Sequence, residues 1–98
     1  LSLAVVGRLG SEEFLLRITR DGMADDIETL QRQLQITARE AEVLLWLARG
    51  KPNRDIAEIL KLSPRTVNKH LEVVFRKLGV ENRAAATAIA VRQLSDNE

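Results

Sequence analysis

The 98-residue sequence predicts a mainly α-helical domain preceded by a short β-hairpin. Two phenylalanines and one tryptophan are the only aromatic residues, although hydrophobic residues make up 45% of the chain, so the core must be built from aliphatic side chains. Apolar residues recur at three- and four-residue spacing over the carboxyl-terminal two thirds. Helix start and stop signals bracket each of these periodic segments. Together these observations favour one small helical unit.

Composition excludes several classes of protein. The absence of cysteine excludes disulfides and thiolate-ligated zinc, and it favours a cytoplasmic location. His70 is the single histidine and cannot form a metal site alone, and the longest apolar run, 43–48, is too short to cross a membrane. We expect no metal, no cofactor, no membrane contact and no small-molecule ligand in this fragment. The start of the chain has no signal-peptide pattern and no methionine, which suggests a piece of a longer protein.

The amino-terminal third is expected to differ from the rest. Residues 1–9 and 14–20 have strand-like content and flank a turn-like segment at 10–13, which predicts a hairpin. Ile27, Leu30 and Leu34 then recur at helical spacing and predict a short linker helix over 24–35. We therefore divide the chain into a hairpin and connector (1–36), a helical domain (37–94) and a tail (95–98).

Local signals place the first two helices of that domain. Thr37 and Glu40 form a capping-box pattern that predicts a helix start, and Gly50 with Pro52 predicts its end. Asn53 is expected to be the N-cap of a two-turn helix, followed by a turn at 61–62.

The third helix has the clearest pattern. Ser63 is its expected N-cap, Pro64 suits its first position and Gly79 its end. One apolar stripe faces the core, formed by Val67, Leu71, Val74, Phe75 and Leu78. Beyond Gly79, Asn82 is expected to cap an alanine-rich helix that runs to about Leu94.

Charge is unevenly distributed along the chain. Residues 1–50 hold six basic and eight acidic residues, a net charge of −2, whereas residues 51–83 hold eight basic and four acidic residues, a net charge of +4. A local basic segment suggests a polyanionic partner, but charge alone favours an ordinary solvated helix surface.

Two helices of unequal length joined by a short turn, the second longer and basic, predict a helix-turn-helix. Its second helix, 64–78, would fit the major groove of duplex DNA. Arg65, Asn68 and Lys69 are of suitable type to reach base edges, and Glu72 either accepts from a cytosine amino group or pairs with Lys69 or Arg76. Residues expected to contact the DNA backbone or support the helix are Ser63, Thr66, His70, Arg76 and Lys77.

Each of these residues also has a plain structural interpretation. Ser63 could be a helix cap without any contact to DNA, and His70 could simply fill a groove beside Thr66. On the last helix Ala84, Ala88 and Val91 form a small-residue face suited to a dimer, but alanine also simply favours helix. An enzyme is not expected, because no glycine-rich phosphate loop, nucleophile–base set or metal-spaced cluster is present.

The segments TAREAEVLLWLARGKPNRDIAEIL (37–60) and SPRTVNKHLEVVFRKLGVENR (63–83) together resemble the carboxyl-terminal DNA-binding domain of LuxR/GerE-type transcriptional regulators. That family includes NarL- and FixJ-like response regulators. The resemblance implies a four-helix domain with its helix-turn-helix at about 53–72 and a last helix commonly used for dimer contact. It places Asn68, Lys69 and Glu72 at groove-facing positions, and Ser63, Arg65, Thr66, His70 and Lys77 at backbone-contacting or supporting ones.

The sequence thus predicts a sequence-specific duplex-DNA-binding domain of a bacterial transcriptional regulator. We expect a homodimer on paired half-sites, a response regulator of a two-component system, and RNA polymerase as a possible further partner. Two alternatives stay open: a promoter-recognition module like those of sigma factors, and a protein-interaction module that uses the alanine-rich helix and the hairpin without reading DNA.

Overall fold

The structure is a computed structural model that describes the backbone of residues 12–96 and the side chains of residues 22–95. Within this part of the chain the fold is entirely helical. The helices are α2 (Glu12–Leu34), α3 (Ala38–Ala48), α4 (Asn53–Leu60), α5 (Pro64–Leu78) and α6 (Arg83–Asp96). The expected mainly helical class is therefore confirmed.

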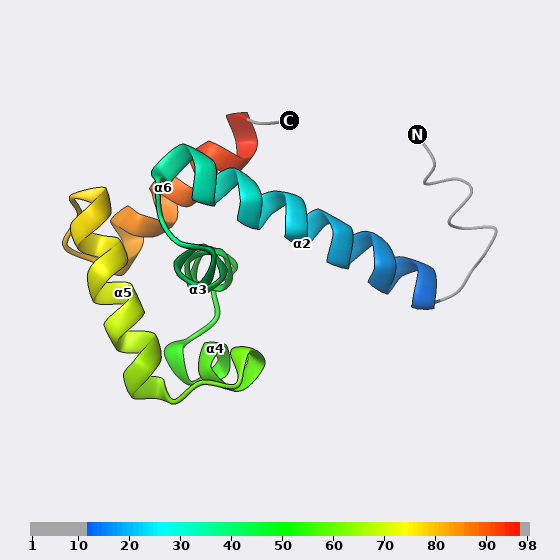
Figure 1. Ribbon diagram of the computed structural model, residues 1–98, viewed down its shortest axis with the longest axis horizontal. Coiled ribbons are helices and arrows are strands. Elements are labelled where there is room, and N and C mark those ends of the chain that lie inside the picture. The colour runs from blue at the N-terminus through cyan, green and yellow to red at the C-terminus, as the bar shows by residue number, and fades with distance from the viewer. Residues whose placement is uncertain (1–11, 97–98) are drawn as a thin grey trace.

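The short helix α3 is the centre of the fold. It contacts all four other helices, and in Figure 1 it is seen end-on between α2, α5, α4 and α6. This position explains its composition, because a helix with neighbours on most sides must be apolar around most of its circumference. Its fully or almost fully buried apolar residues are Ala41, Val43, Leu44, Leu45 and Leu47.

The other helices each contribute one face to the same core. Val67, Leu71 and Val74 of the predicted α5 stripe are buried, and Phe75 and Leu78 are partly buried against them. From the remaining elements, the buried apolar residues are Leu30, Ile36, Ile56, Ala57, Ala86 and Ala90. The predicted helical periodicities were thus good guides to the core-facing sides.

The predicted hairpin is wrong where the structure tests it. Residues 14–20, expected to form its second strand, lie inside α2, and Glu12 and Glu13, expected in the turn, begin that helix. The expected first strand, 1–9, lies outside the described residues. A short apolar run does not by itself distinguish strand from helix. Here a helix established over 23–34 continues toward the amino terminus, because extending a helix costs less than starting a strand pair and no proline interrupts it.

The helix ends follow local chemistry. Thr37 and Glu40 form the predicted capping box: the Thr37 N–H donates to Oε1 of Glu40 at 3.0 Å, and the Glu40 N–H donates to Oγ1 of Thr37 at 3.1 Å. Gly79 ends α5 with a φ of +72°, a conformation that favours glycine. Asn82 caps α6 as predicted, because its Oδ1 accepts from the Ala85 N–H at 2.8 Å. The last helix then extends to Asp96.

Asn53 is the exception among the predicted caps. Pro52 holds the N-cap position of α4 without a side-chain cap bond, and Asn53 is the first helical residue. The Asn53 amide is engaged elsewhere, with partners on α5 and α6. A contact distant in sequence has here replaced a local one.

Candidate DNA-binding interface

Helices α4 and α5 form a helix-turn-helix. Three residues separate Leu60, the end of α4, from Pro64, the start of α5. Lys61 turns the chain with a left-handed φ of 59°, and the Leu62 N–H donates to the Ala57 carbonyl at 2.8 Å. Leu62 also packs against the core, so the turn is anchored on the domain.

The amino-terminal turn of α5 is tightly hydrogen-bonded. Oγ of Ser63 accepts from the Thr66 N–H at 3.1 Å, and the two hydroxyls lie 2.9 Å apart. The predicted cap is confirmed. Both hydroxyls sit where the positive end of the helix dipole favours an anion.

The outer face of α5 carries polar residues that are all exposed. Arg65, Asn68, Lys69, Glu72 and Arg76 are exposed, on the side opposite the buried stripe. No ion pair joins Glu72 to Lys69 or Arg76 among the described side chains, so the expected pairing of Glu72 is absent. His70 is half-buried between the two faces.

Lys77 has a partner inside the domain that the sequence did not reveal. Its Nζ donates to Oε1 of Glu40 at 2.9 Å, the same oxygen that accepts from Thr37. Burial of Glu40 opposes its ionisation, but the hydrogen bonds from Lys77 and from the Thr37 N–H outweigh burial, and the pKa of this carboxyl lies below its usual value. Lys77 thus links the end of α5 to the start of α3.

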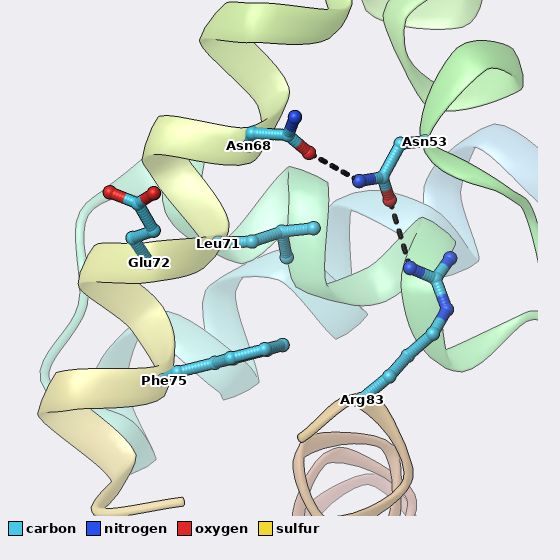
Figure 2. A pocket seen from close by; sticks show the side chains of 6 residues that line it. All are labelled: Asn53, Asn68, Leu71, Glu72, Phe75 and Arg83. Atoms are coloured by element: carbon cyan, nitrogen blue, oxygen red, sulfur yellow. Dashed lines mark hydrogen bonds between the residues drawn. The ribbon is translucent and has the colours of Figure 1, made fainter. Parts of the chain in front are cut away.

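Three helices meet at a hydrogen-bonded chain of side chains beside the outer face of α5. Nη1 of Arg83, at the start of α6, donates to Oδ1 of Asn53 at 2.8 Å, and Nδ2 of Asn53 donates to Oδ1 of Asn68 at 2.5 Å. Arg83 also donates through Nη2 to the Lys51 carbonyl. Figure 2 shows this chain above a hollow that Leu71, Glu72 and Phe75 of α5 also line.

Asn53 and Arg83 are the site residues that the sequence reasoning missed. Arg83 lies 30 residues from Asn53, and nothing in local spacing relates them. The one sign of them in the sequence is that Asn53 lies in segment 37–60 and Arg83 in segment 63–83, the two segments that resemble the LuxR family. The fold, not the pattern, brings these two residues to the same place.

The outer face of α6 carries small apolar side chains. Ala84, Ala88 and Val91 are exposed, with Val91 at 47%, whereas Ala86 and Ala90 are fully buried. The three exposed side chains therefore form one small apolar strip along the helix.

The described residues provide neither a metal site nor a membrane-spanning helix. They hold no group of three or more side chains suited to bind a metal ion. None of their helices is both long enough and apolar enough to cross a bilayer.

A helix-turn-helix with an exposed, polar second helix and a capped, hydroxyl-bearing amino-terminal turn defines a DNA-binding domain. Residues 34–90 match the family model described as bacterial regulatory proteins, luxR family. The chain belongs to this family, and it carries the DNA-binding domain of a transcriptional regulator, a class that does not typically include enzymes. The resemblance found in the sequence is thereby confirmed.

Three similar proteins are named as transcriptional activators or as a response regulator. The chain is 45% identical over 58 residues to the transcriptional activator protein BjaR1 of Bradyrhizobium diazoefficiens, covering 59% of this chain and 24% of that protein. It is 42% identical over 69 residues to the transcriptional activator protein AnoR of Acinetobacter nosocomialis, covering 70% of this chain and 29% of that protein. It is 43% identical over 58 residues to the nitrate/nitrite response regulator protein NarP of Escherichia coli, covering 59% of this chain and 27% of that protein. No solved structure matches the chain.

The chain therefore spans about a quarter of the length of these relatives.

Proposed function

We propose that this domain binds duplex DNA sequence-specifically by inserting α5 into the major groove. The observation that carries the proposal is the two-sided character of α5: its apolar side is buried in the core, and its opposite side presents Arg65, Asn68, Lys69 and Glu72 to solvent. These are side-chain types that hydrogen-bond base edges in the major groove. In this arrangement the core holds α5 rigidly while its polar face is free to read DNA.

Backbone contacts would come from the start of the helix and from its flank. The hydroxyls of Ser63 and Thr66 lie at the positive end of α5, where a phosphate is favoured. Arg76 and the half-buried His70 lie further along the helix, where they would contact phosphates as well. Lys77 supports the interface by tying the end of α5 to α3 through Glu40.

The DNA-reading unit is assigned to residues 37–94, with 1–36 as the preceding segment and 95–98 as a tail. The carboxyl-terminal half of α2 braces this unit, because Leu30 is fully buried in its core. The amino-terminal half of α2 extends beyond the other helices in Figure 1.

The regulator is proposed to act as a homodimer. The strip of Ala84, Ala88 and Val91 would allow two α6 helices to approach closely, since small side chains keep the backbones near one another. Dimer contact would place two copies of α5 on half-sites roughly 34 Å apart, about one turn of DNA. RNA polymerase stays a predicted further partner, and a bacterial DNA-binding regulator would act in the cytoplasm.

A response-regulator role is supported by the printed name of NarP, whereas BjaR1 and AnoR are named as transcriptional activators. The test is phosphorylation of the full-length gene product. Labelling of an aspartate by acetyl phosphate, with tighter DNA binding as a result, would support the role, and the absence of labelling would contradict it.

The test of DNA reading is fluorescence anisotropy of the chain with a randomised duplex pool across a salt series, followed by sequencing of the bound fraction. Binding should weaken steeply with salt and recover an inverted repeat. With the double variant Arg65→Ala/Lys69→Ala, the bound fraction should no longer be enriched in a shared sequence. The control Arg32→Ala/Arg39→Ala removes the same charge from exposed surface pairs on α2 and α3 and should preserve this enrichment.

Other outcomes identify the alternatives. Salt-insensitive or absent binding by folded protein would contradict the proposal and leave a protein-interaction module. Recovery of unpaired promoter-like sequences, bound only together with polymerase, would favour a promoter-recognition module.

A further inference from the structure

The chain of hydrogen bonds from Arg83 through Asn53 to Asn68 has a fixed direction. A guanidinium group can only donate, so the atom of Asn53 that faces Arg83 must be its carbonyl oxygen Oδ1. The Asn53 amide is then oriented, and its Nδ2 faces Asn68 as a donor. Asn68 must therefore turn its own oxygen inward to accept.

This orientation leaves Asn68 with a defined free group. Its Oδ1 is directed to Asn53, and no bond among the described residues uses its Nδ2. An asparagine amide is chemically ambivalent, because it carries an acceptor on one side and two donors on the other. Here the neighbouring helices remove the ambivalence, and the exposed side chain offers donors to solvent.

Among the four residues of α5 proposed to face bases, only Asn68 can present either a donor or an acceptor, so only its orientation has to be fixed by neighbouring residues. Arg65 and Lys69 can only donate, and the carboxylate of Glu72 can only accept. Asn68 lies between these residues on the same exposed face. The pattern of donors and acceptors that α5 offers to the groove is therefore complete only when the Asn68 amide is oriented.

We propose that Arg83 is a positioning residue that sets the hydrogen-bonding polarity of Asn68, and that Asn68 consequently selects a keto base, guanine or thymine. In the major groove guanine presents two acceptors, O6 and N7, and thymine presents O4, whereas cytosine presents only an amino donor and adenine presents an amino donor beside its single acceptor N7. The paired contact that a free asparagine makes with adenine needs Oδ1 and Nδ2 together, and here Oδ1 is engaged. This inference rests on the proposed DNA-reading function.

The sharpest test is Asn53→Asp. Both oxygens of the new carboxylate accept, so it keeps the bond from Arg83 but can no longer donate to Asn68. Asn68 then turns its Nδ2 inward and presents its oxygen to the groove. Selection from a randomised duplex pool should change at one base from guanine or thymine to adenine or cytosine, by roughly fivefold to tenfold, with the rest of the site unchanged.

Asn82→Asp is the matched control. It makes the same change of atoms and charge one residue before Arg83, and the Asn82 oxygen that accepts from Ala85 is retained. Both variants should bind every duplex more weakly, since each adds a negative charge near phosphates. Only Asn53→Asp should change the base preference, and identical preferences in the two variants would overturn the proposal.

A second variant tests Arg83 itself. Arg83→Met releases the Asn53 amide, so the preference at the same base should relax toward all four bases while the other positions keep theirs. A uniform loss of affinity at unchanged preference would show that Arg83 is only structural. Thermal unfolding of each variant confirms that the comparison is between folded proteins.

A readout without DNA separates this inference from the proposed function. The Nδ2 proton that Asn53 donates to Asn68 should exchange more slowly by NMR in the wild-type chain than in Arg83→Met. Equal exchange rates would overturn the positioning role. If the wild-type chain recovers no shared sequence, the proposed function and the base-selecting role fail together, while the exchange rates still decide whether Arg83 orients the amides.

Discussion

Nζ of Lys77, near the end of α5, lies 2.9 Å from Oε1 of Glu40, in the first turn of α3. The carboxylate is buried and also closes the capping box with Thr37. One side chain thus helps to start the central helix α3 and ties α5 to it. The orientation of α5 on the domain depends in part on this link.

Removal of Glu40 is expected to destabilise the domain. Glu40→Ala removes the carboxylate that accepts from the Thr37 N–H and from Lys77, but keeps the bond from the backbone N–H of residue 40 to Oγ1 of Thr37, so the free energy of unfolding should fall by about 1–3 kcal/mol. Urea denaturation measures the loss. Glu42→Ala is the control, because Glu42 pairs with the exposed Arg39 and should contribute below about 0.5 kcal/mol. Equal losses in the two variants would show that the link to Lys77 contributes nothing.

The same carboxyl predicts a specific dependence of stability on pH. The pKa of Glu40 is lower in the folded chain than that of an ordinary glutamate, so its contribution to stability is present above the unfolded-state pKa and is lost as pH falls through the folded-state pKa. Wild-type protein should therefore lose more unfolding free energy between about pH 6 and pH 3 than Glu40→Gln does. Parallel pH profiles of the two proteins, measured by urea denaturation, would contradict this origin of the acid sensitivity.

Ser63 allows capping to be separated from phosphate contact. Ser63→Ala removes the acceptor for the Thr66 N–H and should cost about 1 kcal/mol of unfolding free energy. Ser63→Asp keeps a capping oxygen and should leave stability within about 0.5 kcal/mol of wild type, yet its charge should weaken binding to every duplex. Anisotropy titrations together with denaturation measure both effects. Unchanged DNA binding by Ser63→Asp would show that Ser63 is a cap alone.

The strip on α6 makes a prediction about assembly. Val91 is 47% exposed, so Val91→Glu should leave the fold intact while placing like charges together in a dimer. Sedimentation should then show a monomer that binds a single half-site but loses the advantage of an inverted repeat. Arg92→Ala, on an exposed neighbouring position, changes the net charge equally and should stay dimeric. A dimer that persists in Val91→Glu would place the contact elsewhere.

Much of the helical domain was predictable because its determinants are local. Thr37 and Glu40, Ser63 and Thr66, and Asn82 and Ala85 are each three residues apart, so their capping bonds depend only on backbone geometry that the sequence specifies directly. The apolar stripe of α5 was equally readable, since helical spacing brings its residues to one side wherever the helix lies. These features sufficed to predict the helix-turn-helix and its exposed residues.

The tertiary structure decided everything that depends on distant partners. Residues 14–20 are compatible with strand or helix, and they are helical as a continuation of α2. Lys77 meets Glu40 across 37 residues and so links α5 to α3. Arg83 meets Asn53 across 30 residues, and Asn53, the predicted cap, instead bonds to Arg83 and Asn68. The sequence shows the chemical type of each side chain. The tertiary structure decides which of its atoms stay free, because the packing of α3, α4, α5 and α6 brings distant residues into hydrogen-bonding distance.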